Sequence, residues 1–421
     1  MQILLKQVKI IDPTSPLHGQ VKDVLVRNGR IESIRNHISI DVPTFEFEGA
    51  CISPGWMDIG TWIGDPGYEQ AEVMETASAA ASRGGYTSLI MLPNTQPAMD
   101  VKSAVEYVYN KSRGLISHIY PMGSISQQCR GVELAELMDM HQAGAVAFSD
   151  GIQQMQNSGL LLKALEYVKL FDGLILNHPY ATDLSPEGYI HEGEISVALG
   201  LRGIPALSEL LMVKRDIDLL RYTNSKLHIM NVSSGASLKH IAAAKAEGLQ
   251  ITCSVPILNL LCTDEQVSTF DQNYKVLPPL REEADREALI RGVKDGTIDC
   301  ITSNHRPVDL EHKNLEFAYA EFGISSLETT FPVAVKALGR RTNLGKLIEK
   351  ISITPRKIFG LPVPTIDRGK EAEITIFTPD GNTTLETNNM KSRSKNNPFL
   401  GTILPGMVLG VISKNRMVRF A

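Results

Sequence analysis

The spacing of hydrophobic and polar positions changes twice along the chain, near residue 53 and near residue 362. In residues 3–11, 21–26 and 31–34, apolar side chains alternate with polar ones, which is typical of strands with one buried face. Between the last two runs, Arg27-Asn28-Gly29-Arg30 supplies the Asn-Gly pair of a tight hairpin turn. Residues 1–52 are therefore predicted to form a small β unit.

From residue 53 to residue 362, helical spacing alternates with short apolar runs. This alternation predicts helices that are each followed by a buried strand, at 69–83 and 86–92, 132–143 and 145–148, 160–171 and 174–177, 204–220 and 226–232, 236–247 and 250–254, and 284–295 and 300–302. Repeated strand and helix units favour a parallel sheet, and the length fits a (β/α)8 barrel of about 250 residues or more. Chemistry would then lie at the carboxyl ends of the strands.

The carboxyl-terminal residues 363–421 return to strand patterns. Apolar runs at 372–377, 407–413 and 417–420 predict strands, and the polar stretch 383–397 between them predicts a solvated loop. Because this end is similar in character to the first β unit, both ends are expected to join one β-sandwich beside the barrel.

Composition narrows the class of protein. The 421 residues are 43% hydrophobic and 21% charged, which is ordinary for a globular chain with a large core. A net charge of −5 gives no basic field, so nucleic acid and membrane surfaces are disfavoured as partners. The five cysteines lack Cys-x-x-Cys spacing, and there is neither a signal peptide nor a run of about 18 apolar residues. We expect a cytoplasmic protein.

Several uncommon strings occur in order along the chain. Gly84-Gly85-Tyr86-Thr87 precedes Met91-Leu92-Pro93-Asn94-Thr95-Gln96-Pro97, and later come Pro278-Pro279-Leu280-Arg281 and Asn397-Pro398-Phe399-Leu400-Gly401. Together they resemble the dihydroorotases of the amidohydrolase superfamily, nearly from end to end. The resemblance implies an amidohydrolase-type (β/α)8 barrel. In active members it also implies hydrolysis of a cyclic amide in pyrimidine biosynthesis by water that zinc activates.

The first barrel strand departs from that family at its metal-binding pair. Residues 55–67 resemble the family segment, but Gly60 and Trp62 stand in place of the two histidines of His-x-His. Side chains two apart in a strand point to the same face, which is why such a pair can bind one ion. Glycine offers no side chain, and the indole N–H is a donor with no lone pair for a metal.

Two further losses follow from the same resemblance. In the segment 228–233 the second metal-binding histidine is replaced by Asn231. In the segment 304–308 the aspartate that serves as general base and ligand is replaced by Asn304. The resemblance thus implies that no catalytic residue remains.

The substrate side of the implied site is reduced as well. Gly64 replaces the arginine that pairs with the substrate carboxylate, Leu277 replaces an asparagine, and Asn94 is kept as a substrate-binding residue. Asp150 and His178 resemble remnants of the metal set. Two ligands cannot hold catalytic zinc, which takes three from the protein, so neither a metal nor another cofactor is expected.

Each of these positions also has a simpler interpretation. A single histidine such as His178 or His305 is most often a hydrogen-bonded residue of the core or a loop. Trp62 is most simply a packing residue that fills the space left by metal and imidazole. Arg306 is either an anion-binding group or a solvated or paired side chain.

We therefore expect an inactive dihydroorotase homologue. By resemblance to inactive homologues of that kind, it would be an oligomeric structural or regulatory partner of aspartate carbamoyltransferase. One alternative is an active dihydroorotase or other cyclic-amide hydrolase that uses zinc in a rebuilt site around Asp150, His178, His305 and Arg306. Another is a ligand sensor that keeps Asn94 and the pocket without turnover.

Overall fold

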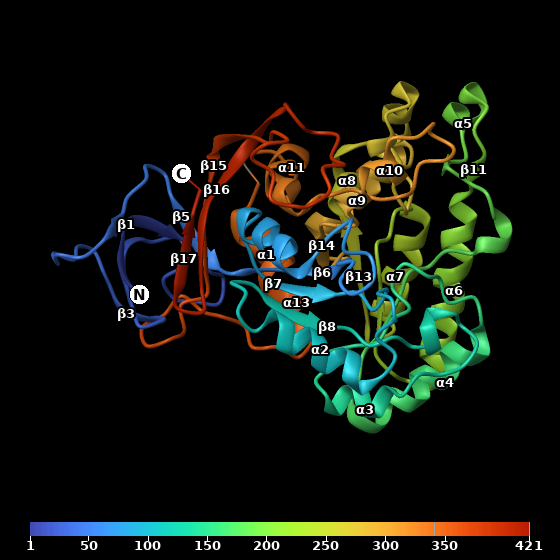
Figure 1. Cartoon of the computed structure of the whole chain (residues 1–421), viewed down its shortest axis with the longest axis horizontal. Coiled ribbons are helices and arrows are strands. Elements are labelled where there is room, and N and C mark those ends of the chain that lie inside the picture. Colours follow the sequence, from blue (N-terminus) through green and yellow to red (C-terminus); the bar gives the residue numbers. More distant parts are fainter. Residues whose placement is uncertain (341, 421) are drawn as a thin grey trace.

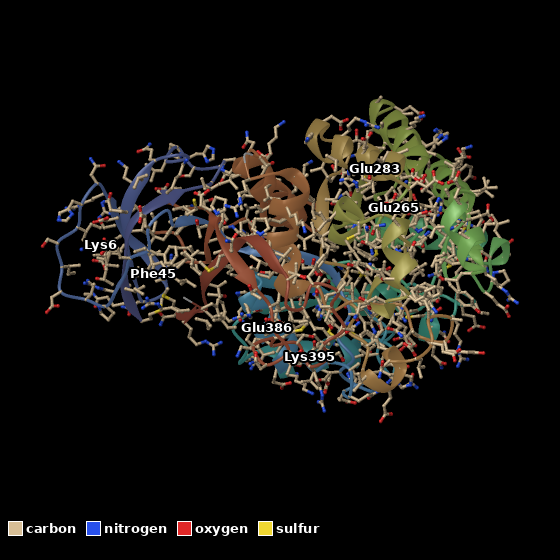
Figure 2. All side chains as sticks on the ribbon, turned by 90° about the horizontal axis from the view of Figure 1, so that it is seen from above. Lys6, Phe45, Glu265, Glu283, Glu386 and Lys395 are labelled. Carbon is tan, nitrogen blue, oxygen red and sulfur yellow. The ribbon has the colours of Figure 1, made fainter. Side chains whose placement is uncertain are left out.

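The computed structural model describes residues 1–340 and 342–420, which form a β-sandwich beside a (β/α)8 barrel. In Figure 1 the blue strands of the amino end and the red strands of the carboxyl end lie together, and the barrel occupies the other side. Figure 2 places Lys6 and Phe45 in the sandwich and Glu265 and Glu283 in the barrel. No helix in the described part of the chain is long and apolar enough to cross a membrane.

Parallel strands form the wall of the barrel in two groups. The first group contains β6 (Trp56–Thr61), β7 (Tyr86–Met91) and β8 (His118–Pro121). The second contains β9 (Ile175–Asn177), β12 (Leu227–Ile229), β13 (Ile251–Pro256) and β14 (Cys300–Thr302). Phe148 joins the groups through single bridges to Gly123 and Ile175. The predicted strand 145–148 is thus reduced to one bridging residue.

The barrel closes between its first and last strands through a buried carboxylate. Asp58 of β6 accepts hydrogen bonds from the Ser303 backbone N–H at 2.7 Å, the Ser303 hydroxyl at 2.6 Å and the Thr61 hydroxyl at 2.6 Å. Burial raises the pKa of Asp58, whereas these donors lower it. Asp58 therefore fixes the end of β14 against β6, next to the carboxyl ends of the strands.

Helices cover the outside of the barrel with apolar faces turned inward. The longer ones are α1 (Met74–Arg83), α2 (Lys102–Ser112), α4 (Ser158–Val168), α6 (Ala206–Thr223), α7 (Gly235–Ala246), α9 (Glu283–Asp295) and α11 (Thr330–Leu338). The unit formed by α2 and β8 was not predicted from the sequence. The predicted helix 69–83 begins only at Met74, because residues before it turn across the barrel mouth.

Strands from both ends of the chain form the sandwich as one continuous sheet around its own apolar core. In sheet order they are β17 (Arg416–Arg419), β16 (Ile403–Ser413), β15 (Ile374–Thr384), β5 (Cys51–Pro54), β1 (Gln2–Ile10), β2 (Val21–Arg27) and β3 (Arg30–Arg35). The predicted hairpin between β2 and β3 is confirmed: Asn28 and Gly29 have φ of 50° and 76°. The sheet extends to Pro54, and β6 begins at Trp56.

The polar stretch 383–397 was predicted as a solvated loop, and this is wrong for its second half. Ser392, Ser394 and Asn396 are buried against the barrel mouth. The Asn396 side chain accepts hydrogen bonds from the Val308 backbone N–H at 3.1 Å and from a serine hydroxyl at 2.6 Å. The polar composition did not predict this burial, because most of the buried polar groups in this half bind groups of the barrel instead of water.

Candidate functional site

The carboxyl ends of the strands surround a central cavity of only about 20 Å³. Its walls come from several strands and their following loops: Gly60, Trp62, Leu92, Gly151, Ile152, His178, Met230, Asn231, Leu277, Asn304, His305 and Arg306. A water molecule needs about 10–15 Å³ on the same measure. This cavity, at the strand ends where barrels of this kind carry their active sites, thus has room for about one water.

Met230 fills the space in front of Gly60. Gly60 has φ of 78°, and a Cβ atom added there would lie 2.8 Å from the Met230 methyl carbon. Met230 itself is 3% exposed. A histidine at position 60 would therefore need both an unfavourable backbone conformation and a displaced methionine.

Trp62 closes the central cavity from outside. Its ring is 8% exposed and lies 5.8 Å from the ring of Tyr68, centroid to centroid. The indole Nε1–H donates to the backbone oxygen of Asn94 at 2.9 Å. The side chain lines both the central cavity and a larger pocket beyond it. These contacts are those of a packing residue with a satisfied N–H group.

An uncharged hydrogen-bond chain crosses the expected metal positions. The Thr302 hydroxyl donates to the Asn231 side-chain oxygen at 2.9 Å, and the Asn231 amide donates to the Asn304 side-chain oxygen at 3.0 Å. The Asn304 amide in turn donates to the backbone oxygen of Leu277 at 3.2 Å. Each amide is satisfied by a neighbour, so this chain stabilises β12 and β14 without a cation.

Asp150 and His178 do not converge on one site. Both Asp150 oxygens are occupied by the loop after β8: one accepts from the N–H groups of Ile125 at 3.0 Å and Ser126 at 2.9 Å, and the other from the Ser126 hydroxyl at 2.6 Å. His178 lines the cavity, and burial together with the positive charge of Arg306 lowers its pKa to about 4. Its imidazole is therefore neutral at physiological pH.

His305 acts as a structural tether in this geometry. Its Nδ1 accepts the backbone N–H of Ser326 at 3.1 Å, so the ring proton sits on Nε2, which lies 3.5 Å from a carboxylate oxygen of Glu72. Glu72 also binds the Ser392 hydroxyl and, at 3.1 Å, the Arg393 backbone N–H. Sequence reasoning missed Glu72 because the residue lies inside the segment predicted as a helix.

Two of the three substrate-side positions of the implied site, Asn94 and Gly64, are occupied by contacts within the protein. The Asn94 amide donates to the Asp150 backbone oxygen at 2.9 Å, and its side-chain oxygen accepts from the Ile152 N–H at 2.9 Å. At Gly64, an added Cβ atom would lie 2.4 Å from the backbone oxygen of Tyr68. The loop between residues 64 and 68 therefore leaves no room for an arginine.

A zinc centre would need ligand side chains that the fold brings together. Within residues 1–340 and 342–420, no group of three or more His, Cys, Asp or Glu side chains is placed to hold a metal ion. A catalytic zinc needs three protein ligands and an open position. The residues at the carboxyl ends of the strands do not fit such a centre.

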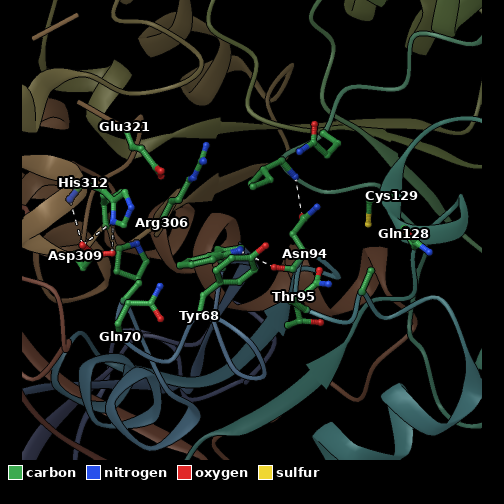
Figure 3. A pocket seen from close by; sticks show the side chains of 18 residues that line it. Tyr68, Gln70, Asn94, Thr95, Gln128, Cys129, Arg306, Asp309, His312 and Glu321 are labelled. Atoms are coloured by element: carbon green, nitrogen blue, oxygen red, sulfur yellow. Dashed lines mark hydrogen bonds and ion pairs between the residues drawn. The ribbon is translucent and has the colours of Figure 1, made fainter. Parts of the chain in front are cut away.

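Outside Trp62 lies a second pocket of about 370 Å³, drawn in Figure 3. Sequence reasoning singled out Asn94 and Arg306 among its walls. It missed the aromatic Tyr68 and the polar residues from separate loops, which are Gln70, Thr95, Gln96, Gln128 and Gln153. Thr95 and Gln96 lie in the string 91–97 without a role assigned to them, and the other loop residues carry no motif, so only the folded structure brings them together.

Comparisons with known proteins agree with this architecture. The family model described as Dihydro-orotase-like matches residues 49–237. L-Hydantoinase (dihydropyrimidinase) from Arthrobacter aurescens superposes with a TM-score of 0.86 at 22% identity, covering 99% of this chain and 96% of that one. Dihydropyrimidinase from Brevibacillus agri gives 0.84 at 21% identity, covering 100% and 95%. These structures confirm the predicted barrel and terminal β-sandwich.

Two dihydroorotases are more similar to this chain in sequence than those solved structures are, and these matches also cover nearly the whole of both chains. The dihydroorotase of Syntrophus aciditrophicus is 38% identical over 99% of this chain and 99% of its own length. The dihydroorotase of Acetivibrio thermocellus is 38% identical over 99% of this chain and 98% of its own. With identity at this level along nearly the whole of both chains, the protein belongs to the dihydroorotase family.

Proposed function

We propose that this protein is a noncatalytic dihydroorotase homologue of pyrimidine biosynthesis that acts as a structural or regulatory subunit for aspartate carbamoyltransferase. The observation that carries the proposal is the uncharged chain through Asn231 and Asn304, which occupies the reaction centre of the fold. An enzyme that opens a cyclic amide needs an activated water and a base beside the substrate. The centre of this barrel offers amides and a methionine instead.

The size of the cavity supports the same conclusion. About 20 Å³ remains between the side chains at the strand ends. Dihydroorotate is many times larger than a water molecule, so it reaches this point only if Trp62 and Met230 move. The catalytic alternative would need Asp150, His178, His305 and Arg306 to act together, but Asp150 and His305 are bound to structural partners.

Association with a partner is supported by three exposed apolar side chains on one face of α6. Leu207 and Leu211 are 50% and 43% exposed, and Tyr222 is 76% exposed. At the spacing of an α-helix, these three residues fall on one face, which also carries the exposed charges of Lys214 and Asp218. Clustered apolar side chains that face water mark sites of protein contact more often than isolated ones do. We assign this face of α6 to the interface with the carbamoyltransferase.

Gel filtration of a mixture with the aspartate carbamoyltransferase of the same organism tests the association. We expect one early peak containing both chains at micromolar concentration, because permanent complexes bury more than about 2,000 Å² in total. Leu211→Glu should weaken coelution, since a charge would be buried without a partner. Ile403→Glu, at an exposed apolar position of the terminal sheet, is the matched control and should coelute.

Two results would contradict different parts of this proposal, which are the subunit role and the assignment of the interface to α6. Two independent peaks for the wild-type proteins, together with unchanged carbamoyltransferase kinetics, would contradict the subunit role. Coelution that survives Leu211→Glu would contradict only the assignment of the interface to α6.

A further inference from the structure

The pocket outside Trp62 has the size and enclosure of a small-molecule site. Its volume of about 370 Å³ falls within the range of about 300–1,000 Å³ that such sites occupy. Trp62 separates it from the closed central cavity, so a ligand can occupy the pocket without entering the barrel. Figure 3 shows Arg306 and Glu321 on one side of this pocket and Asn94 and Gln128 on the other.

Arg306 is the unusual charge in this pocket. The side chain is half-buried and lines both the pocket and the central cavity. Within residues 1–340 and 342–420, its guanidinium group makes no hydrogen bond and no ion pair. Burial lowers the pKa of Arg306, and the negative charge of Glu321 opposes that shift. A half-buried guanidinium that faces a pocket and has no partner within the protein favours binding of an anion.

The second acid in the pocket, Asp309, is a carboxylate that its neighbours already hydrogen-bond. One Asp309 oxygen accepts hydrogen bonds from the N–H groups of Glu311 at 3.1 Å and His312 at 3.2 Å, where a short helix begins. The same carboxylate lies 2.8 Å from the His312 ring, whose pKa it raises by hydrogen bonding and charge. Asp309 therefore opposes an incoming anion less than its charge alone suggests.

The remaining walls suit a flat, polar ring. Trp62 and Tyr68 present aromatic surface, and four glutamines surround it: Gln70, Gln96, Gln128 and Gln153. Within the described part of the chain, none of these four side-chain amides makes a hydrogen bond. Each amide can both donate and accept, which matches alternating carbonyl and N–H groups on a ring.

We propose that this pocket binds a small planar anion, a polar ring with one carboxylate or phosphate group. The anionic group would pair with the guanidinium of Arg306, and the ring would lie against Trp62 and Tyr68 within reach of the glutamine amides. This pocket lies beside the closed central cavity, on the other side of Trp62, and shares Arg306 with it as a wall. The proposal stands whether or not a carbamoyltransferase binds.

Isothermal titration of the purified full-length chain tests the site. The probes are orotate, a planar ring with a carboxylate, and uridine 5′-monophosphate, a ring with a phosphate. Uracil is the control, because it carries the same ring without an anion. We expect saturable binding of at least one anionic probe. Arg306→Gln should weaken it by about ten-fold or more, as expected for loss of a charged hydrogen bond.

Two further variants make the result specific. Arg306→Lys keeps the charge but loses the paired N–H groups of arginine, so its affinity should lie between those of the wild type and Arg306→Gln. Arg113→Gln, at an exposed arginine at the end of α2, should bind as the wild type does.

The results show whether the pocket binds an anion and whether that anion carries a carboxylate or a phosphate. Tighter binding of orotate supports a carboxylate ligand, and tighter binding of uridine 5′-monophosphate supports a phosphate ligand. The proposal is overturned if neither anion binds saturably at millimolar concentration. Uracil that binds as tightly as both anions would overturn it as well, and so would equal affinity in a folded Arg306→Gln variant, as judged by its circular dichroism.

Discussion

Replacing Trp62 by alanine is expected to lower the free energy of unfolding by about 3–5 kcal/mol, the range for truncating a large buried aromatic side chain. The ring is 8% exposed and seals the central cavity, so its loss leaves a void beside Met230. It also removes the hydrogen bond from the indole N–H to the Asn94 backbone. Urea unfolding followed by circular dichroism measures the change.

Trp62→Phe is the matched control for this prediction. Phenylalanine keeps most of the ring but loses the N–H donor, so we expect a smaller loss, near 1–2 kcal/mol, about the value of one hydrogen bond plus a small packing defect. A shift near zero for Trp62→Ala would show that the ring contributes little to the closed barrel mouth, and the packing interpretation would fail.

The second large effect concerns Arg356, which lies in α13 (Thr354–Ile358) and is fully buried. Its guanidinium is 2.6 Å from a carboxylate oxygen of Glu373 and donates to the Gly55 backbone oxygen at 2.6 Å. Glu373 precedes β15, and Gly55 lies between β5 and β6, so the pair joins barrel to sandwich. Arg356→Met should cost about 3–5 kcal/mol because it leaves a largely buried carboxylate without its cation.

Lowering the pH should remove the stabilisation by the Arg356–Glu373 ion pair from the wild-type protein. Burial raises the pKa of Glu373, but the charge of Arg356 and the Thr87 hydroxyl outweigh this, and the pKa stays below its ordinary value. A lowered carboxylate pKa stabilises the folded state above the unfolded pKa, about 4.3 for glutamate. The stabilisation is lost as the pH falls through the folded pKa. Arg356→Met should lack this part of the acid dependence.

A double variant separates the pair from general packing. Adding Glu373→Gln to Arg356→Met removes the stranded charge, so part of the lost stability should return. A loss below about 1 kcal/mol for Arg356→Met, the size of an exposed ion pair, would contradict its role at the junction.

The sequence was sufficient to predict the barrel and the sandwich because both depend on periodic burial. The hairpin at Asn28 and Gly29 is one example: its residues adopt the positive φ that the turn requires. The unit of α2 and β8 was missed, since α2 buries only Val105 and Val108 among its apolar side chains and β8 spans only four residues. Short strands inside a barrel are defined by their neighbours more than by their own pattern.

At the site, residue types indicated what is missing but not what replaced it. By resemblance to the family, Gly60 and Asn304 are expected to stand where active members have ligands. That Met230 fills the space at Gly60, and that Asn231 and Asn304 bind each other, depends on contacts between distant segments. The burial of Ser392 against Glu72 could not be predicted for the same reason, because a polar residue with a buried partner resembles a solvated one in sequence.

Zinc-dependent hydrolysis of dihydroorotate, assayed side by side for the wild type and Asn304→Asp, tests the loss of catalysis most directly. A restored general base contributes about 10²–10⁴-fold, but here it would act on water that no metal has activated. We predict that both proteins, dialysed against zinc, stay at the rate of buffer alone. Turnover by either one that appears with zinc and disappears with a chelator would contradict the account, because the metal site would then never have been lost.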